Sequence, residues 1–276
     1  MKIFPEQTTL AAGFEIEGIG LHKGLPVKMR IEPAAADAGV VFDLNGEKIL
    51  ADHAHAVVSA RNTTIASGSG AQIHTVEHIL SAFYGMGVDN ATVYLDSEEP
   101  PALDGSAGPI AAAIAEAGIT RLDKPARTLN LREPFVIGEK GALVFFLPAP
   151  AFKATYILDY QHPMIGTQAA DFEQVISDYA AEVANARTFG MIEEVDALKN
   201  AGLALGGSVE NAVVIYPDRY SSDLRFKNEF ARHKLLDLIG DVSLIGARLN
   251  AHCLGVRSGH ALNIKAIRGV LAEAII

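Results

Sequence analysis

The chain has 276 residues and a formal net charge of −10, from 33 acidic and 23 basic side chains. Binding to a nucleic-acid backbone is driven by clustered Lys and Arg, so this balance argues against a nucleic-acid partner. Cys253 is the single cysteine, which excludes an internal disulfide and a thiolate zinc cluster, so any metal must be held by nitrogen and oxygen atoms.

The hydropathy pattern gives no sign of a membrane or export segment. Every apolar run is far shorter than the ~20 residues that cross a bilayer, so we expect no transmembrane segment. The first residues, MKIFPEQTTLAAG, lack the apolar core of a secretory signal. We therefore expect a cytoplasmic protein.

In the first sixty residues, apolar and polar side chains alternate in the manner of a half-buried sheet. Val27, Met29 and Ile31 alternate with basic residues, and residues 39–44 form a second short pattern of the same kind. Strands are therefore expected in both places.

After the SGSG turn at 67–70 the period changes to that of a helix. Its apolar face is formed by Val76, Ile79, Leu80 and Phe83, and Gly85 stands where a C-cap is expected. The elements expected next are a strand at 90–96, an alanine-rich helix capped by Asp104 or Ser106, and a connection at 120–126.

From residue 127 the strand pattern begins again, so a second domain is indicated. Strands are expected at 127–131, 142–147, 154–160 and 211–215, with polar and helical material before the last of them. The chain then closes, like the first half, with helix, strand and helix, at 230–239, 250–256 and 261–274. We predict an α+β fold of two tandem domains of similar topology, spanning 1–122 and 127–276.

The segment HTVEH, His74 to His78, matches the HxxEH pattern of inverted zinc peptidases, in which two histidines bind zinc and the glutamate is the general base. If the whole segment is helical, His74 and His78 share one face, and Glu77 reaches a metal from the side. The alternative is one histidine in the core and one facing solvent.

A second group of titratable residues lies in NEFARHKLLDLIGDV, where His233, Asp237 and Asp241 are four residues apart. This spacing puts all three on one helix face, and the surrounding apolar residues favour a cavity over a solvated surface, which is the alternative. An imidazole and a carboxylate one turn apart can bind one cation, and a third ligand from elsewhere leaves the fourth position of a tetrahedral zinc open for water.

His260 follows Gly259 at the start of the last expected helix. The helix dipole lowers the pKa of a histidine in that position, so a useful imidazolium needs a carboxylate partner, for which Asp241 is the candidate. The alternative is a histidine at a helix start with no role.

The longer motifs carry a family resemblance over nearly the whole chain. They are GIGLHKG, HTVEHILSAFYGMGVDN, LDGSA, ARTFG, LGGSVENAVV, LRFKNEFARHKLLDLIGDV and SGHALN. In this order and spacing they resemble the zinc-dependent UDP-3-O-acyl-N-acetylglucosamine deacetylases of Gram-negative bacteria. The resemblance implies two α+β domains, each a sheet with paired helices, and an active site between them. It also implies cytoplasmic hydrolysis of the acylated UDP-sugar to UDP-3-O-acyl-glucosamine and acetate, the committed step of lipid A biosynthesis.

The resemblance also implies roles for individual residues. The zinc ligands, for one Zn²⁺ per chain, fall on His78, His233 and Asp237, and His74 is not among them. The other catalytic positions are Glu77 as general base, His260 as the active-site histidine, Asp241 as its support and Thr188 as an oxyanion partner. The substrate contacts are Phe189 and Lys234, the latter otherwise a helix-surface cation. An apolar passage for the acyl chain falls on 191–208, with Leu198, Leu203, Leu205 and Gly207.

Two other functions compete with this one. A zinc peptidase using HTVEH leaves His233, Asp237 and Asp241 without a role, and a non-catalytic sugar-nucleotide binding protein leaves a full set of catalytic positions unused. Two histidines and an aspartate also accept Fe²⁺, so iron is an alternative to zinc. We expect a monomer whose only partner is its small-molecule substrate.

Overall fold

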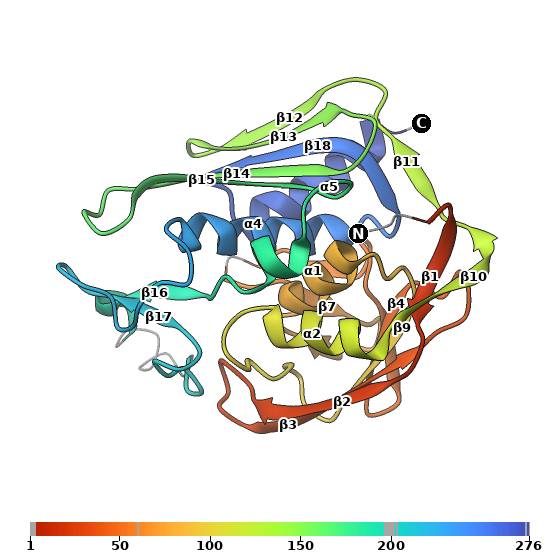
Figure 1. The fold of residues 1–276 in the computed structure, drawn as a ribbon, viewed down its shortest axis with the longest axis horizontal. Coiled ribbons are helices and arrows are strands. Elements are labelled where there is room, and N and C mark those ends of the chain that lie inside the picture. The colour runs from red at the N-terminus through yellow and green to blue at the C-terminus, as the bar shows by residue number, and fades with distance from the viewer. Residues whose placement is uncertain (1–3, 60, 196–201, 203, 274, 276) are drawn as a thin grey trace.

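The computed structural model describes residues 4–59, 61–195, 202, 204–273 and 275, and the structural statements below refer to these residues. Two sheets form the outer layers, and the long helices lie between them (Figure 1). None of the helices within the described ranges is long and apolar enough to span a membrane.

The first sheet has five strands in the order β2-β3-β9-β4-β5. Their bounds are β2 Phe14–Ile19, β3 Pro26–Pro33, β9 Ala91–Leu95, β4 Val40–Leu44 and β5 Glu47–Leu50. The last strand in sequence, β9, is central, antiparallel to β3 and parallel to β4.

The second sheet repeats this topology in the order β12-β13-β18-β14-β15. Its strands are β12 Phe135–Glu139, β13 Ala142–Pro148, β18 Arg248–Val256, β14 Lys153–Tyr160 and β15 Gly166–Glu173, and β11, Thr128–Asn130, also pairs with β18. Its last strand, β18, is again central, antiparallel to β13 and parallel to β14. The predicted α+β fold with two halves of similar topology is therefore confirmed.

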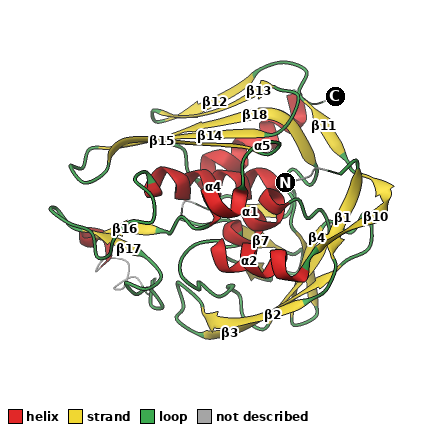
Figure 2. Cartoon of the chain, viewed as in Figure 1, coloured by secondary structure: helices red, strands yellow, loops and turns green. Residues whose placement is uncertain are grey.

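Each half places one helix before its central strand and one after it in the sequence. The four helices lie between the two sheets (Figure 2). These are α1 Glu77–Met86 and α2 Gly108–Ala117 in the first half, and α4 Glu229–Ser243 and α5 His260–Glu273 in the second. A short π-helix, η1, Ala180–Ala184, lies beside them. The helices α1 and α4 pack against each other, so the two halves meet along the helical layer.

The remaining strands form small sheets. β1 Glu6–Leu10 pairs with β10 Ile119–Pro125, and β16 Phe189–Met191 pairs in parallel with β17 Val213–Ile215. β6 Ala56–Val57, β7 Thr64–Ala66 and β8 Gln72–Ile73 form a three-stranded sheet next to α1 in sequence.

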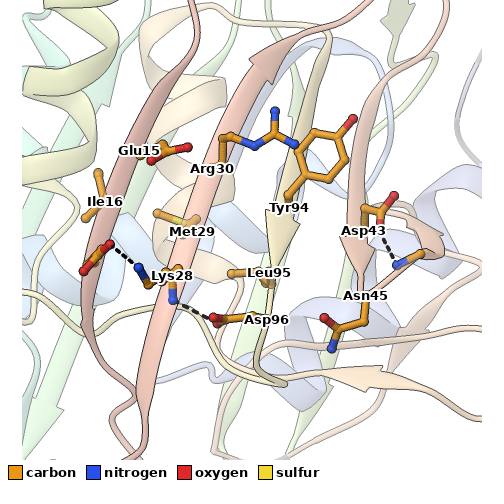
Figure 3. Close-up of a pocket in the computed structure, with 12 residues that line it drawn as sticks. Glu15, Ile16, Lys28, Met29, Arg30, Asp43, Asn45, Tyr94, Leu95 and Asp96 are labelled. Carbon is orange, nitrogen blue, oxygen red and sulfur yellow. Dashed lines mark hydrogen bonds and ion pairs between the residues drawn. The ribbon is translucent and has the colours of Figure 1, made fainter.

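The two faces of β3 differ as the alternation predicted. Val27, Met29 and Ile31 are buried against the helical layer. On the opposite face, the Arg30 guanidinium lies 4.1 Å from the centre of the Tyr94 ring and Lys28 pairs with Glu17, so the hollow shown in Figure 3 is a polar outer surface. It contains none of the predicted site residues.

Several predicted boundaries were wrong. Residues 120–126 are not a simple connection, because β10 covers 119–125 and pairs with β1. A strand, β15, stands where polar and helical material was expected. The alanine-rich helix begins after Ala107 with no side-chain cap, although the Ser106 hydroxyl accepts a hydrogen bond from the Gly108 amide at 3.1 Å.

The helix that follows the SGSG turn is also displaced from its predicted limits. Its C-cap is Gly87, at φ 78°, whereas Gly85 lies inside the helix, where a Cβ atom would be 2.2 Å from the Tyr179 ring. The helix begins at Glu77, and Thr75 has a positive φ of 60°, so His74 precedes the helix. The predicted shared helix face of His74 and His78 is therefore wrong.

Candidate metal centre and active site

The candidate site forms where α1 of the first half meets α4 of the second. Glu77 and His78 are the first two residues of α1, and Gly240 of α4 lies directly against Glu77. A Cβ atom on Gly240 would be 2.2 Å from the backbone oxygen of Glu77, so only glycine allows this approach. The site residues of both helices are consequently held close together.

Three side chains from these helices converge on one point. His78 Nε2 is 3.7 Å and His233 Nε2 is 3.5 Å from Asp237 Oδ1. One ligand atom from each lies within 4.8 Å of the others, and this is the one such group of histidine, cysteine and acidic residues found in the described part of the chain. The structure thus brings together the three residues that the resemblance implied as ligands.

The chemistry of these atoms suits a divalent cation. Asp237 Oδ1 is buried without a hydrogen-bond partner, although a buried polar atom normally has one. Burial and the neighbouring His233 lower the pKa of His78 to about 3, and burial lowers the pKa of His233, so both imidazoles are neutral and able to coordinate. His233 Nδ1 lies 3.1 Å from the Ala186 carbonyl, a contact that fixes Nε2 toward the cluster.

Lys234 is tied to the same carboxylate. Its Nζ atom donates to Asp237 Oδ2 at 2.6 Å. Burial raises the pKa of Asp237, but the charges of Lys234 and the histidines outweigh it and hold that pKa below its usual value. Burial lowers the pKa of Lys234, but the charge of Asp237 outweighs it and raises that pKa. Lys234 is therefore not a free cation on the helix surface, which was the alternative interpretation of this residue.

Glu77 lies beside the cluster. Burial raises the pKa of its carboxyl to about 7, against the opposing effect of His260. The Thr63 amide donates to Glu77 Oε2 at 2.9 Å, and Glu77 Oε1 lies 3.8 Å from His260 Nε2. A carboxylate with a pKa near neutrality is suited to accept a proton.

His260 begins α5 and is paired with Asp241, as predicted from the sequence. The His260 Nδ1 to Asp241 Oδ2 distance is 3.0 Å. Burial alone lowers the pKa of His260, but the charges of Asp241 and Glu77 and the hydrogen bond to Asp241 together raise it to about 9. These contacts favour the imidazolium form of His260, whose Nε2 lies 3.8 Å from Asp237 Oδ2.

Thr188 and Phe189 reach the site from the loop and strand that follow η1. The Thr188 amide donates to the Gly105 carbonyl of the first half at 2.8 Å, and Thr188 lines a narrow cavity together with Thr75 and His78. The centre of the Phe189 ring is 6.2 Å from that of His233. Both residues are therefore close to the cluster.

Only part of the segment predicted to form the acyl passage lies within the described residues. Leu198 and Leu203 lie outside the described residues. The Leu205 amide donates to the His22 carbonyl at 3.0 Å, and Leu205 and Gly207 belong to a turn that rests on the GIGLHKG loop of the first half. The Leu205 side chain is exposed.

His74 is not part of the cluster. Its Nδ1 atom lies 2.9 Å from Thr64 Oγ1. An inverted peptidase needs both histidines of HTVEH at the metal, so the geometry argues against that alternative. Thr63, which contacts three groups of the site, was missed by the sequence analysis, because its partners are up to 197 positions away.

Comparison with known proteins covers almost the entire chain. Residues 7–272 match the LpxC family model, described as UDP-3-O-acyl N-acetylglycosamine deacetylase. The chain is 40% identical over 272 residues to the UDP-3-O-acyl-N-acetylglucosamine deacetylase of Geobacter sp. (strain M21), with 96% of this chain and 88% of the relative covered. It is 37% identical to the enzyme of the same name from Nautilia profundicola (97% and 92% covered) and 39% identical to that from Myxococcus xanthus (97% and 87% covered).

Proposed function

The chain belongs to the UDP-3-O-acyl-N-acetylglucosamine deacetylase family, and from that premise we propose which residues carry the reaction. The protein is a metal-dependent hydrolase that removes the acetyl group from UDP-3-O-acyl-N-acetylglucosamine in lipid A biosynthesis. His78, His233 and Asp237 bind the metal, which is Zn²⁺, one per chain. The observation that carries this assignment is the buried Asp237 Oδ1, which faces both imidazoles and has no hydrogen-bond partner.

The metal, when bound, supplies Lewis acidity toward the amide oxygen and lowers the pKa of water at the site. Glu77 takes the proton of the attacking water on Oε1, the carboxylate oxygen that the Thr63 amide leaves free. As the water oxygen bonds to the acetyl carbon, negative charge develops on the former carbonyl oxygen. The His260 imidazolium and the Thr188 hydroxyl stabilise that charge.

The C–N bond then breaks, and the departing amine takes a proton from one of the two groups that face it, Glu77 or His260. The products are acetate and the free 2-amino sugar. Asp241 keeps His260 charged and in one orientation through the 3.0 Å contact with Nδ1. Phe189, Lys234 and Gly207 contact the substrate.

We also propose that the halves fold as domains spanning 1–122 and 127–276, with the site at their interface. All candidate ligands and acid–base groups come from one chain, which supports a monomer. A uridine-nucleotide substrate supports a cytoplasmic location.

The test uses protein stripped of metal and refilled with Zn²⁺ or Fe²⁺, assayed on UDP-3-O-acyl-N-acetylglucosamine of several acyl lengths. We expect release of acetate only after refilling, with Zn²⁺ sufficient for activity. No product with either metal at any acyl length would contradict the assignment, and full activity of the stripped protein would contradict the proposed metal centre.

A further inference from the structure

Thr63 makes direct contact with three of the groups proposed above for acid–base chemistry. It lies immediately before β7 and its side chain has no exposed surface. Its amide donates to Glu77 Oε2 at 2.9 Å, its hydroxyl donates to Asp241 Oδ1, and its Oγ1 atom lies 3.0 Å from His260 Nδ1. A single residue therefore joins the candidate base to the candidate imidazolium and its carboxylate.

The amide contact decides which oxygen of Glu77 is available for catalysis. With Oε2 held by Thr63, Oε1 is the oxygen directed toward His260 Nε2, 3.8 Å away. The Thr63 carbonyl also accepts a hydrogen bond from the Val76 amide at 3.2 Å, directly before α1. The residue thus fixes both the start of α1 and the orientation of its first side chain.

The hydroxyl contact completes the surroundings of Asp241. Asp241 Oδ2 receives the Asn263 amide group at 2.8 Å and lies 3.0 Å from His260 Nδ1, while Oδ1 receives the Thr63 hydroxyl and lies 3.2 Å from the same nitrogen. Asp241 is fully buried, so no bulk water replaces a lost donor. Loss of the hydroxyl leaves Oδ1 with the His260 contact alone, so the carboxylate can turn and His260 turns with it.

These contacts also connect the two halves of the fold. Thr63 and Glu77 come from the first half, whereas Asp241 and His260 lie on α4 and α5 of the second. We propose that Thr63 is a positioning residue that sets the distance and orientation between Glu77 and the Asp241–His260 pair. The inference rests on the roles proposed above for these three residues.

The contacts of Thr63 predict an effect on turnover and little effect on the binding of substrate or metal. Thr63 is completely buried, and none of its hydrogen bonds involves His78, His233 or Asp237. Loss of its hydroxyl should therefore lower kcat while KM and metal content stay close to those of the original protein. A residue that only stabilises the fold would not produce this division.

The test compares Thr63→Val, Thr63→Ser and Thr64→Val in the metal-loaded protein. Thr63→Val keeps the side-chain shape and the amide contact to Glu77 but removes the hydroxyl, and we expect kcat to fall about 10- to 100-fold. Thr63→Ser restores the hydroxyl and should recover kcat to within about threefold of the original protein.

Thr64→Val is the matched control. Thr64 is the buried neighbour, and its hydroxyl bonds Asn62 and His74 instead of the site. It should lose a similar amount of thermal stability as Thr63→Val but keep its kcat. Thermal unfolding and metal analysis of each variant show whether a loss of rate reflects folding or metal content.

Two results would overturn the proposal: a kcat for Thr63→Val within about twofold of the original, or an equal loss in Thr64→Val. The underlying roles are tested separately by Glu77→Gln. If that variant keeps full activity, the proposed base is wrong, whatever Thr63→Val does.

Discussion

The two halves of the molecule share a topology but contribute unequally to the candidate site. In each half a helix precedes the central strand, α1 before β9 and α4 before β18, and a second helix follows it. Helix α1 supplies site residues only at its first two positions, whereas α4 supplies four along its length, His233, Lys234, Asp237 and Asp241. The last helix of the second half begins with His260, while the equivalent α2 begins with Gly108 and Pro109, which cannot titrate. The two halves therefore share a fold, but their equivalent helices do not carry equivalent site residues.

The difference shows what each half does. The first half places a carboxylate and one imidazole at a helix start, and the second provides His233, Asp237, Asp241 and His260, which are about as buried as Glu77. Neither half holds the full ligand group, because His78 lies on α1 and its two partners on α4. The predictions that follow ask how far this division holds.

The largest effect should come from removing a ligand from the second half. His233→Ala should lose the metal and reduce deacetylation by more than about 1000-fold, the size of loss seen when a central catalytic group is removed. His74→Ala is the matched control, since His74 belongs to HTVEH but lies outside the cluster. Metal analysis and acetate release measure both variants. Loss of metal from His74→Ala, with metal kept in His233→Ala, would place the centre entirely in the first half.

The next largest effect concerns the base supplied by the first half. Glu77→Gln should keep the metal and lower kcat by about 100- to 10,000-fold, the usual contribution of general acid–base catalysis. Glu116→Gln, on the exposed side of α2, changes the same charge away from the site and should leave kcat unaltered. Steady-state kinetics with metal analysis distinguish the two. An active Glu77→Gln variant would mean that the second half supplies the base.

How much could be predicted from the sequence depended on the distance between interacting residues. The line of His233, Asp237 and Asp241 was predictable because the helical period alone puts them on one face. The start of α1 was not, because Thr75 takes a positive φ that its residue type does not signal. The contacts of Thr63 were even less predictable, because its partner Asp241 is 178 positions away and meets it only when the halves pack together.

The missed strands have a similar explanation. β10 and β15 carry many exposed or half-exposed residues and become strands through pairing with β1 and β14. Their own apolar pattern is weak, so the partner decides the conformation. The candidate site residues could be named in spite of this, because the family motifs relate residues that lie far apart in the sequence, which local periodicity cannot do.

The third prediction tests the acid–base pair by pH. Activity needs Glu77 deprotonated, so it should rise with pH through the pKa of Glu77, about 7, and it needs His260 protonated, so it should fall through the pKa of His260, about 9. A bound cation lowers both values, and both limbs should therefore lie at or below these figures.

Asp241→Asn removes the charge that raises the pKa of His260, so the alkaline limb should move to lower pH by about one unit or more. Asp171→Asn, at an exposed aspartate of β15, is the control and should leave the profile in place. A pH–rate profile of kcat measures both variants. A flat profile between pH 5 and 9 would contradict the pairing of the first-half base with the second-half imidazolium.

The smallest of these effects concerns the contact that holds the halves together. Gly240→Ala places a Cβ atom 2.2 Å from the Glu77 backbone oxygen, and no side-chain rotation relieves an overlap with backbone. Helix α4 must therefore move away from α1, at a cost of about 1–3 kcal/mol in the free energy of unfolding. His78 lies on α1, whereas His233 and Asp237 lie on α4. The same movement therefore lengthens the distances between the three ligand atoms, and metal affinity should fall along with stability. Gly68→Ala, where nothing lies within 4 Å, is the control in thermal unfolding and metal titration. If Gly240→Ala lost stability but bound metal as tightly as before, the geometry of the ligand group would not depend on the contact between α1 and α4. The packing of the two halves would then have no part in metal binding.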